Sequence, residues 1–183
     1  MKRTQKTLIV DDEHLAMRGY VNELKAAAFD VKQCFDPDKS LKYVRDHYFS
    51  IIAIVLDIML PAGERFRNEN TMNGLITGLH LYRDLKSRCP RVPFLFLTNV
   101  PNDVLSDILD RFDDVPREMV VHKMECKPAE LVRMLRNLLQ KSGQFHNLVH
   151  ESSPAISSEG VVRMHRNGPT RRHPKKRKRP TKR

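Results

Sequence analysis

The sequence has little of the chemistry that cross-links small proteins or anchors chains in a bilayer. It has no tryptophan, and its three cysteines, Cys34, Cys89 and Cys126, lie far apart without a C-x-x-C pair. This pattern disfavours a disulfide framework and a structural zinc site. The longest apolar run, residues 51–56, is too short to span a membrane, and the apolar residues 8–10 are too few for a targeting segment. We therefore expect reduced thiols, a cytoplasmic location and no membrane partner.

Positive charge is concentrated at one end of the chain. Residues 1–140 contain 21 lysines and arginines against 20 acidic residues, whereas residues 141–183 contain 12 against two. The second segment is also poor in hydrophobic residues, so it cannot bury enough surface to fold alone. We expect one folded domain at residues 1–140 and a basic, disordered tail at residues 141–183.

Short apolar runs alternate with segments of helical periodicity along the first 140 residues. Five segments are expected to be strands: residues 7–10, 31–35, 51–56, 93–98 and 119–122. Five are expected to be helices: residues 15–28, 36–46, 74–86, 103–112 and 128–140. The third strand shows no polar alternation, as expected for a strand buried on both faces. The alternation predicts an α/β fold with a parallel sheet covered by helices.

Acidic residues follow two of the predicted strands. Asp11 and Asp12 end the first strand and Asp57 ends the third, while Thr98 and Lys123 end the fourth and fifth. In an open parallel sheet, ligands bind beyond the carboxyl ends of the strands. If the first and third strands are neighbours, the carboxylates repel one another by roughly 4 kcal/mol for each pair at ~4 Å. Such a cluster needs a cation, and an all-oxygen ligand set favours Mg²⁺ and the acceptance of a phosphoryl group.

Four short motifs carry a resemblance to a known family. They are Leu-Ile-Val-Asp-Asp-Glu at residues 8–13, Leu-Asp-Ile-Met-Leu-Pro at 56–61, Phe-Leu-Thr at 96–98 and Val-His-Lys at 121–123. Over about residues 5–140 the chain resembles the receiver domain of two-component response regulators. The resemblance implies a flavodoxin-like fold, a doubly wound sheet of five parallel strands in the order 2-1-3-4-5. Since the basic tail shows no second folded module, we expect a stand-alone receiver with a basic tail.

The resemblance assigns a role to each residue of the acidic cluster. It implies that Asp57 is the phosphoacceptor, that Thr98 donates a hydrogen bond to the phosphoryl group, and that Lys123 pairs with that group. It implies that Mg²⁺ is held by four groups: the carboxylates of Asp12 and Asp57, the Asp11 carboxylate through water, and the backbone carbonyl of Met59. The chain would then be a phosphoprotein rather than an enzyme.

Several positions depart from the pattern of the family. The segment of residues 62–73 makes the loop after Asp57 longer than usual, and its charged side chains are of solvated types, for which we expect only a role in partner recognition. Asn99 stands where a small residue is usual and would crowd the phosphoryl pocket. Val120 occupies the position of the usual aromatic switch residue. A second lysine, Lys127, precedes a proline and competes with Lys123 for the lysine role, although strand position favours Lys123.

Two side chains bear on the lifetime of a phosphorylated form. By resemblance to the family, Met59 and Val100 flank the path of the water that would hydrolyse an aspartyl phosphate. Neither side chain can orient water, so we expect slow loss of phosphate.

The first functional hypothesis is a response regulator in a Mg²⁺-dependent phosphorelay. A sensor histidine kinase or a phosphotransfer protein would phosphorylate Asp57, and a downstream protein partner would read the result. The alternative is a phosphorylation-independent scaffold or a nucleic-acid-binding adaptor. It would act through the tail, where residues 171–179 carry seven positive charges able to bind nucleic acid or an acidic partner with little specificity. A hydrolase is weaker, because Met59 stands where a second acid would be needed.

Overall fold

The computed structural model describes residues 5–143, and the tail predicted beyond them lies outside the described residues. The described part contains one sheet of five parallel strands in the order β2-β1-β3-β4-β5. The predicted α/β class and strand order are therefore confirmed. Within residues 5–143, no helix combines the length and the apolar character needed to cross a bilayer.

Every expected strand and helix is present, with small differences at the ends. The strands are β1 (Lys6–Val10), β2 (Asp30–Cys34), β3 (Ile51–Leu56), β4 (Phe94–Thr98) and β5 (Val120–His122). The helices are α1 (Arg18–Ala26), α2 (Pro37–His47), α3 (Thr77–Arg88), α4 (Asn102–Leu109) and α5 (Pro128–Lys141), with 3₁₀ turns η1 (Tyr48–Ser50) and η2 (Arg117–Met119). α3 begins after residue 74 because Met72, Asn73 and Gly74 have φ values of 50°, 57° and 96°, which no right-handed helix contains.

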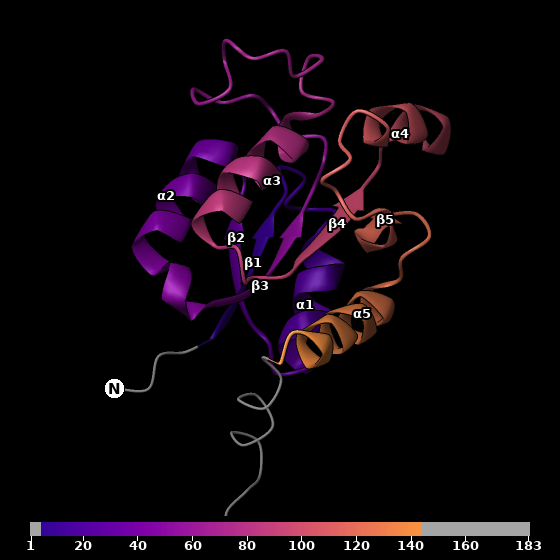
Figure 1. Ribbon diagram of the computed structural model, residues 1–183. Coiled ribbons are helices and arrows are strands. Elements are labelled where there is room, and N and C mark those ends of the chain that lie inside the picture. The colour runs from indigo at the N-terminus through magenta and orange to yellow at the C-terminus, as the bar shows by residue number, and fades with distance from the viewer. Residues whose placement is uncertain (1–4, 144–183) are drawn as a thin grey trace, which may run out of the picture. The chain divides into compact units, whose positions relative to one another are not determined.

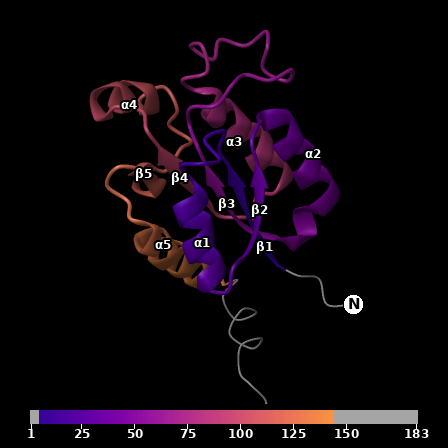
Figure 2. The same cartoon turned by 180° about the vertical axis from the view of Figure 1, so that it is seen from behind.

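The helices cover the sheet in two layers. α1 and α5 pack together on one face, where Leu24 and Leu135 are fully buried (Figure 2). α2 and α3 cover the other face together with α4, and Val44 and Leu79 are fully buried there (Figure 1). β3 lies at the centre with all its residues buried, as its unbroken apolar sequence predicts.

The charged side chains of the long loop between β3 and α3 are exposed, as expected, but the loop also contributes to the core. Phe66 is only 1% exposed and belongs to the hydrophobic core beneath α2 and α3. The Asp38 carboxylate, in the first turn of α2, accepts hydrogen bonds from the backbone N–H groups of Glu64 (2.7 Å) and Arg65 (3.0 Å). Arg65 in turn pairs with Asp84 of α3 at 2.9 Å. The loop is thus fastened to both helices, and one of its side chains completes the core.

We predict that Phe66→Ala lowers the free energy of unfolding by about 3–5 kcal/mol, because it removes a buried aromatic ring and leaves a cavity. The measurement is urea unfolding followed by circular dichroism. Arg67→Ala is the matched control, since Arg67 lies next in the chain with an exposed side chain, and it should change stability by no more than about 0.5 kcal/mol. Equal effects of the two variants would contradict the burial of Phe66.

Candidate functional site

Three aspartates meet at the carboxyl ends of β1 and β3. The two strands are neighbours, with Val10 opposite Leu56, so the residues that follow them lie side by side. The backbone N–H of Asp57 donates to the carbonyl of Val10 at 2.9 Å. Each of Asp11, Asp12 and Asp57 offers a carboxylate oxygen, and these oxygens all lie within 4.8 Å of one another. Asp11 and Asp57 are 3% exposed, whereas Asp12 is exposed.

Lys123 brings a positive charge into this cluster from the end of β5. Its Nζ lies 2.6 Å from Asp57 Oδ2, 2.8 Å from Asp11 Oδ2 and 2.8 Å from Glu13 Oε2. Burial alone would lower the pKa of Lys123, but the neighbouring carboxylates outweigh it and hold the pKa above its ordinary value. Lys127 is exposed, and its carbonyl accepts the first hydrogen bonds of α5. Of the two candidate lysines, Lys123 is therefore the one that reaches Asp57.

Two buried side chains support this arrangement. Thr98, fully buried at the end of β4, hydrogen-bonds to Asp57 and also accepts the backbone N–H of Val100 at 3.3 Å. Its carbonyl accepts the backbone N–H of Lys123 at 2.8 Å. The hydroxyl of Tyr20 on α1 lies 2.9 Å from the carbonyl oxygen of Lys123 and 2.7 Å from that of Cys126. The periodicity of α1 identifies Tyr20 only as a core residue, and no sequence signal reveals this contact.

Glu13 is a site residue that sequence reasoning missed. Its Oε2 accepts hydrogen bonds from Lys123 and, at 3.1 Å, from the side-chain amide of Asn99. Its backbone N–H donates to Asp11 at 2.9 Å. Glu13 therefore links the loops that follow β1, β4 and β5. Asn99 is exposed and turned towards Glu13, so the expected crowding takes the form of a contact across the mouth of the site.

A cavity of about 600 Å³ opens onto Asp57. Asp12, Glu13 and Asn99 line it together with residues 59–61 and 72–75. The long loop thus forms one wall of the cavity, which the sequence did not predict. Met59 is 39% exposed in this cavity, and its backbone N–H donates to Asp57 Oδ1 at 3.0 Å. The role of its carbonyl as a metal ligand stays a prediction.

Gly78 sets the distance between α3 and the residues that follow β3. A Cβ atom at this position would lie 1.9 Å from the backbone oxygen of Asp57 and 2.7 Å from Cα of Ile58. The N–H of Gly78 donates to the carbonyl of Ile58 at 2.9 Å. Since both close neighbours are backbone atoms, only glycine allows the first turn of α3 to pack against the residues that follow β3.

The prediction that Val100 lies beside the path of a hydrolytic water is wrong. Val100 is fully buried in the hydrophobic core, so its side chain cannot flank a path for water beside Asp57. Of the two residues expected there, only Met59 lines the cavity. Val120, in the position of the usual aromatic switch, begins β5 and packs partly buried against the core.

The charges of the site do not balance. Asp11, Asp12, Glu13 and Asp57 bring four carboxylates together, and among residues 5–143 Lys123 is the one cation that pairs with them. Burial raises the pKa of Asp57, and it raises the pKa of Asp11 to about 6, although Lys123 opposes both shifts. An excess of closely spaced oxygen ligands over positive charge fits a hard divalent cation such as Mg²⁺.

Solved receiver domains share this fold. The chain superposes on a CheY-like response regulator receiver domain from Methanospirillum hungatei with a TM-score of 0.60 and 15% identity, covering 77% of this chain and 98% of that one. For a response regulator receiver domain from Clostridium thermocellum the TM-score is 0.59 and the identity 17%, covering 76% and 97%. For the receiver domain of a Francisella response regulator the values are 0.57 and 16%, covering 76% and 99%. No protein-family model and no curated protein matches the sequence. The likenesses show the receiver fold.

We predict that Asp11 makes the metal-free protein less stable as the pH rises from about 4 to 6. Its pKa of about 6 exceeds the ordinary value of 3.8, so the folded protein binds more protons than the unfolded chain in this window. In chelator, the free energy of unfolding should fall relative to Asp11→Asn by up to about 3 kcal/mol between these pH values. The measurement is urea unfolding of both proteins. Parallel pH profiles would contradict the elevated pKa.

Proposed function

We propose that this chain, which has the receiver fold, accepts a phosphoryl group on Asp57 from a histidine kinase or phosphotransfer protein in a Mg²⁺-dependent phosphorelay. The observation that carries the proposal is the approach of three aspartate oxygens to within 4.8 Å of one another, with the Lys123 ammonium 2.6 Å from Asp57. A phosphoacceptor needs a carboxylate nucleophile beside groups that neutralise the negative charge of the transferred phosphoryl oxygens. Asp57 and Lys123 meet both needs.

In this proposal the metal is held by Asp12, by Asp57, by Asp11 through water and by the backbone carbonyl of Met59. When bound, Mg²⁺ would neutralise charge on the phosphoryl oxygens. Asp12 is suited to hold it because its carboxylate is exposed and faces the cavity of the site.

Transfer follows as a displacement at phosphorus. An oxygen of Asp57 forms the new O–P bond while the N–P bond of a phosphohistidine breaks, and the bonding electron pair leaves with the imidazole nitrogen. Thr98 and Lys123 then hold the phosphoryl oxygens by a hydrogen bond and an ion pair. The added negative charge competes with Glu13 for Lys123. If Lys123 turned to the phosphoryl group, Glu13 would keep its hydrogen bond from Asn99 but lose its ion pair, which changes the charge at the rim of the site.

In this proposal the protein is a regulator rather than an enzyme with turnover. A partner protein binds the surface that phosphorylation has changed. The alternative scaffold or nucleic-acid adaptor depends on the tail, which lies outside the described residues. The cluster of Asp11, Asp12, Asp57, Thr98 and Lys123 favours the phosphoacceptor, because a scaffold has no use for repelling carboxylates in one place.

We predict that the full chain gains one phosphoryl group from a small phosphodonor with Mg²⁺, and that Asp57→Asn gains none. Asp12→Ala should reduce the initial rate at least about tenfold, because it removes an exposed metal ligand. The measurement is intact mass against time. Asp107→Ala is the matched control, since it removes an exposed carboxylate on α4 away from the site, and it should react like the wild type. Full labelling in chelator, or of Asp57→Asn, would refute the proposed function.

We predict that the phosphorylated protein loses its phosphate slowly and that Met59→Asn loses it several-fold faster. The apolar side chain of Met59 lines the cavity beside Asp57, whereas an amide there can hold a water molecule for attack on phosphorus. The measurement is the decay of the phosphorylated mass after removal of the donor. Met124→Asn is the control, because Met124 is 89% exposed and does not line the cavity. A wild-type decay rate in Met59→Asn would contradict this explanation.

A further inference from the structure

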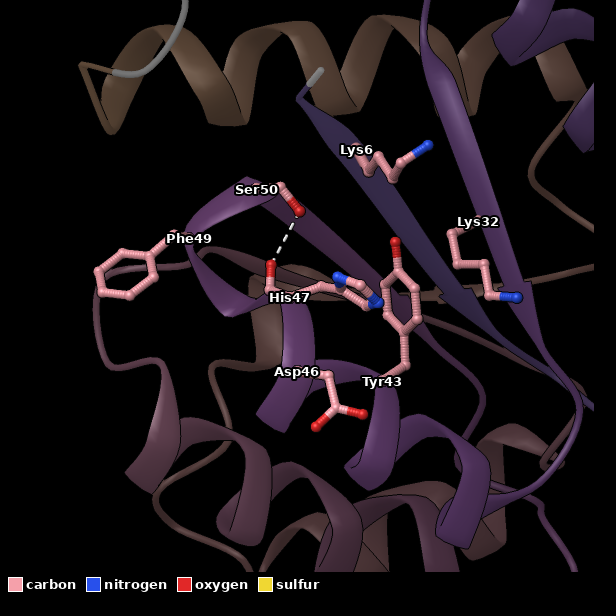
Figure 3. A pocket seen from close by; sticks show the side chains of 7 residues that line it. All are labelled: Lys6, Lys32, Tyr43, Asp46, His47, Phe49 and Ser50. Carbon is pink, nitrogen blue, oxygen red and sulfur yellow. Dashed lines mark hydrogen bonds between the residues drawn. The ribbon is translucent and has the colours of Figure 1, made fainter. Parts of the chain in front are cut away.

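A second hollow lies at the opposite ends of the strands from the aspartates. It has a volume of about 520 Å³ and lies between β1, β2, the last turn of α2 and η1, with Lys6 and Ser50 near the amino ends of β1 and β3 (Figure 3). A neighbouring hollow of about 480 Å³ shares Lys32, Tyr43, Asp46 and His47 with it and continues along β2 to Phe35. Together the two hollows form one surface feature, the β2–α2 groove.

Most charges of the groove are already paired. Lys6 pairs with Asp30 at 2.6 Å, and Lys39 pairs with Asp36 at 2.7 Å. Asp46, the one carboxylate that lines the groove, pairs with its chain neighbour on α2. These pairs cancel, so the net charge of the groove depends on its remaining lysines.

Two lysines in the groove have no carboxylate partner within residues 5–143. They are Lys32 in the middle of β2 and Lys42 on α2. The Lys32 ammonium lies 5.3 Å from the centre of the Tyr43 ring. Figure 3 shows the ammonium groups of Lys6 and Lys32 projecting towards the same side, with the His47 ring beside Tyr43. The groove therefore presents two lysines without a carboxylate partner in the described part of the chain, together with the aromatic rings of Tyr43 and His47.

Exposed aromatic rings stand at both ends of the groove. Phe35 is 42% exposed at one end, and Phe49 is 71% exposed at the other. Between them, the rings of Tyr43 and His47 pack with centroids 4.5 Å apart. A ligand that fills the whole groove would thus meet apolar surface at its ends and positive charge in its middle.

The floor of the groove is the edge of the sheet. β2 pairs with β1 on one side and with no strand on the other within the described residues. An edge strand offers alternate backbone N–H and C=O groups to a further strand. A peptide added there would place alternate side chains in the groove, because side chains alternate between the two faces of a sheet.

Charge decides which chain fits this edge. A second copy of this protein, paired β2 to β2, would bring Lys32 against the Lys32 of its partner, which like-charge repulsion disfavours. Residues 141–183 are strongly basic and are disfavoured for the same reason. Nucleic acid is acidic but has no peptide backbone to continue the sheet. An acidic peptide satisfies both the charge and the strand edge.

We propose that the β2–α2 groove binds an acidic, extended peptide segment of a partner protein, which adds to β2 as a sixth strand. Two carboxylates of the segment pair with Lys32 and Lys42, and apolar side chains on either side of them cover Phe35 and Phe49. The charged part of this interaction is separate from the phosphoryl chemistry of Asp57, because Lys32 and Lys42 belong to β2 and α2 and not to the aspartate cluster. Phe35 lies nearer to that cluster, since it follows Cys34, whose carbonyl accepts the backbone N–H of Asp11.

The test uses the full chain and a labelled heptapeptide with phenylalanine, glutamate, glutamate and phenylalanine at alternate positions and threonine between them. Binding is followed by fluorescence anisotropy at low salt. Lys32→Glu/Lys42→Glu should weaken binding at least about tenfold. Lys25→Glu/Lys141→Glu is the matched control, because it makes the same change of charge at exposed positions of α1 and α5, and it should weaken binding less than about twofold.

Two further probes separate the groove from unspecific attraction. Two further peptides carry N-methyl groups on alternate backbone amides, one on the odd-numbered and one on the even-numbered residues. At least one of them should lose binding, because strand addition needs the N–H groups that face β2. Equal weakening by the two double variants, or full binding of both methylated peptides, would overturn the proposal. Groove-dependent binding of a labelled single-stranded RNA, with no binding of the peptide, would overturn it in favour of nucleic acid.

Discussion

The mutual repulsion of three aspartates, held in check by one buried lysine, is the constraint on which the site depends. Parallel pairing of β1 with β3 brings Asp11 and Asp57 together, and the ammonium of Lys123, at the end of β5, reaches both. The last strand must therefore end at a fixed height, and Tyr20 of α1 contributes to this by binding the carbonyl of Lys123. A helix that covers one face of the sheet thus helps to position the lysine that neutralises the carboxylates.

Local sequence patterns predicted the parts of the site that lie at strand ends. Asp57 follows a run of six apolar residues, and Lys123 follows a short strand, so their height on the sheet could be inferred from the chain alone. Glu13 could not be found in this way, because its partners lie 86 and 110 residues away in the chain. Val100 was misplaced, since a polar or apolar residue type does not say which way a loop turns after its strand ends.

The two ends of the sheet have different chemistry. At the carboxyl ends, buried carboxylates and Lys123 are suited to a small, highly charged group. Along the edge of β2, Lys32 and exposed aromatic rings offer a positively charged and partly apolar surface. Both arise from the same topology, because an open parallel sheet has one polar end where loops converge and one free strand at each side. A single domain can therefore hold a reactive site and a docking edge without either obstructing the other.

The buried ring of Phe66 makes the long loop a contributor to the stability of the fold. Lengthening a connection ordinarily costs closure entropy, which grows slowly with length. Here the long loop offsets the entropy of closure, because it places an aromatic side chain in the core and two backbone N–H groups within hydrogen-bonding distance of Asp38. Shortening the loop to remove residues 62–73 would therefore leave a hole under α2 and α3 instead of a tighter turn. We therefore expect the loop to unfold together with the sheet rather than ahead of it.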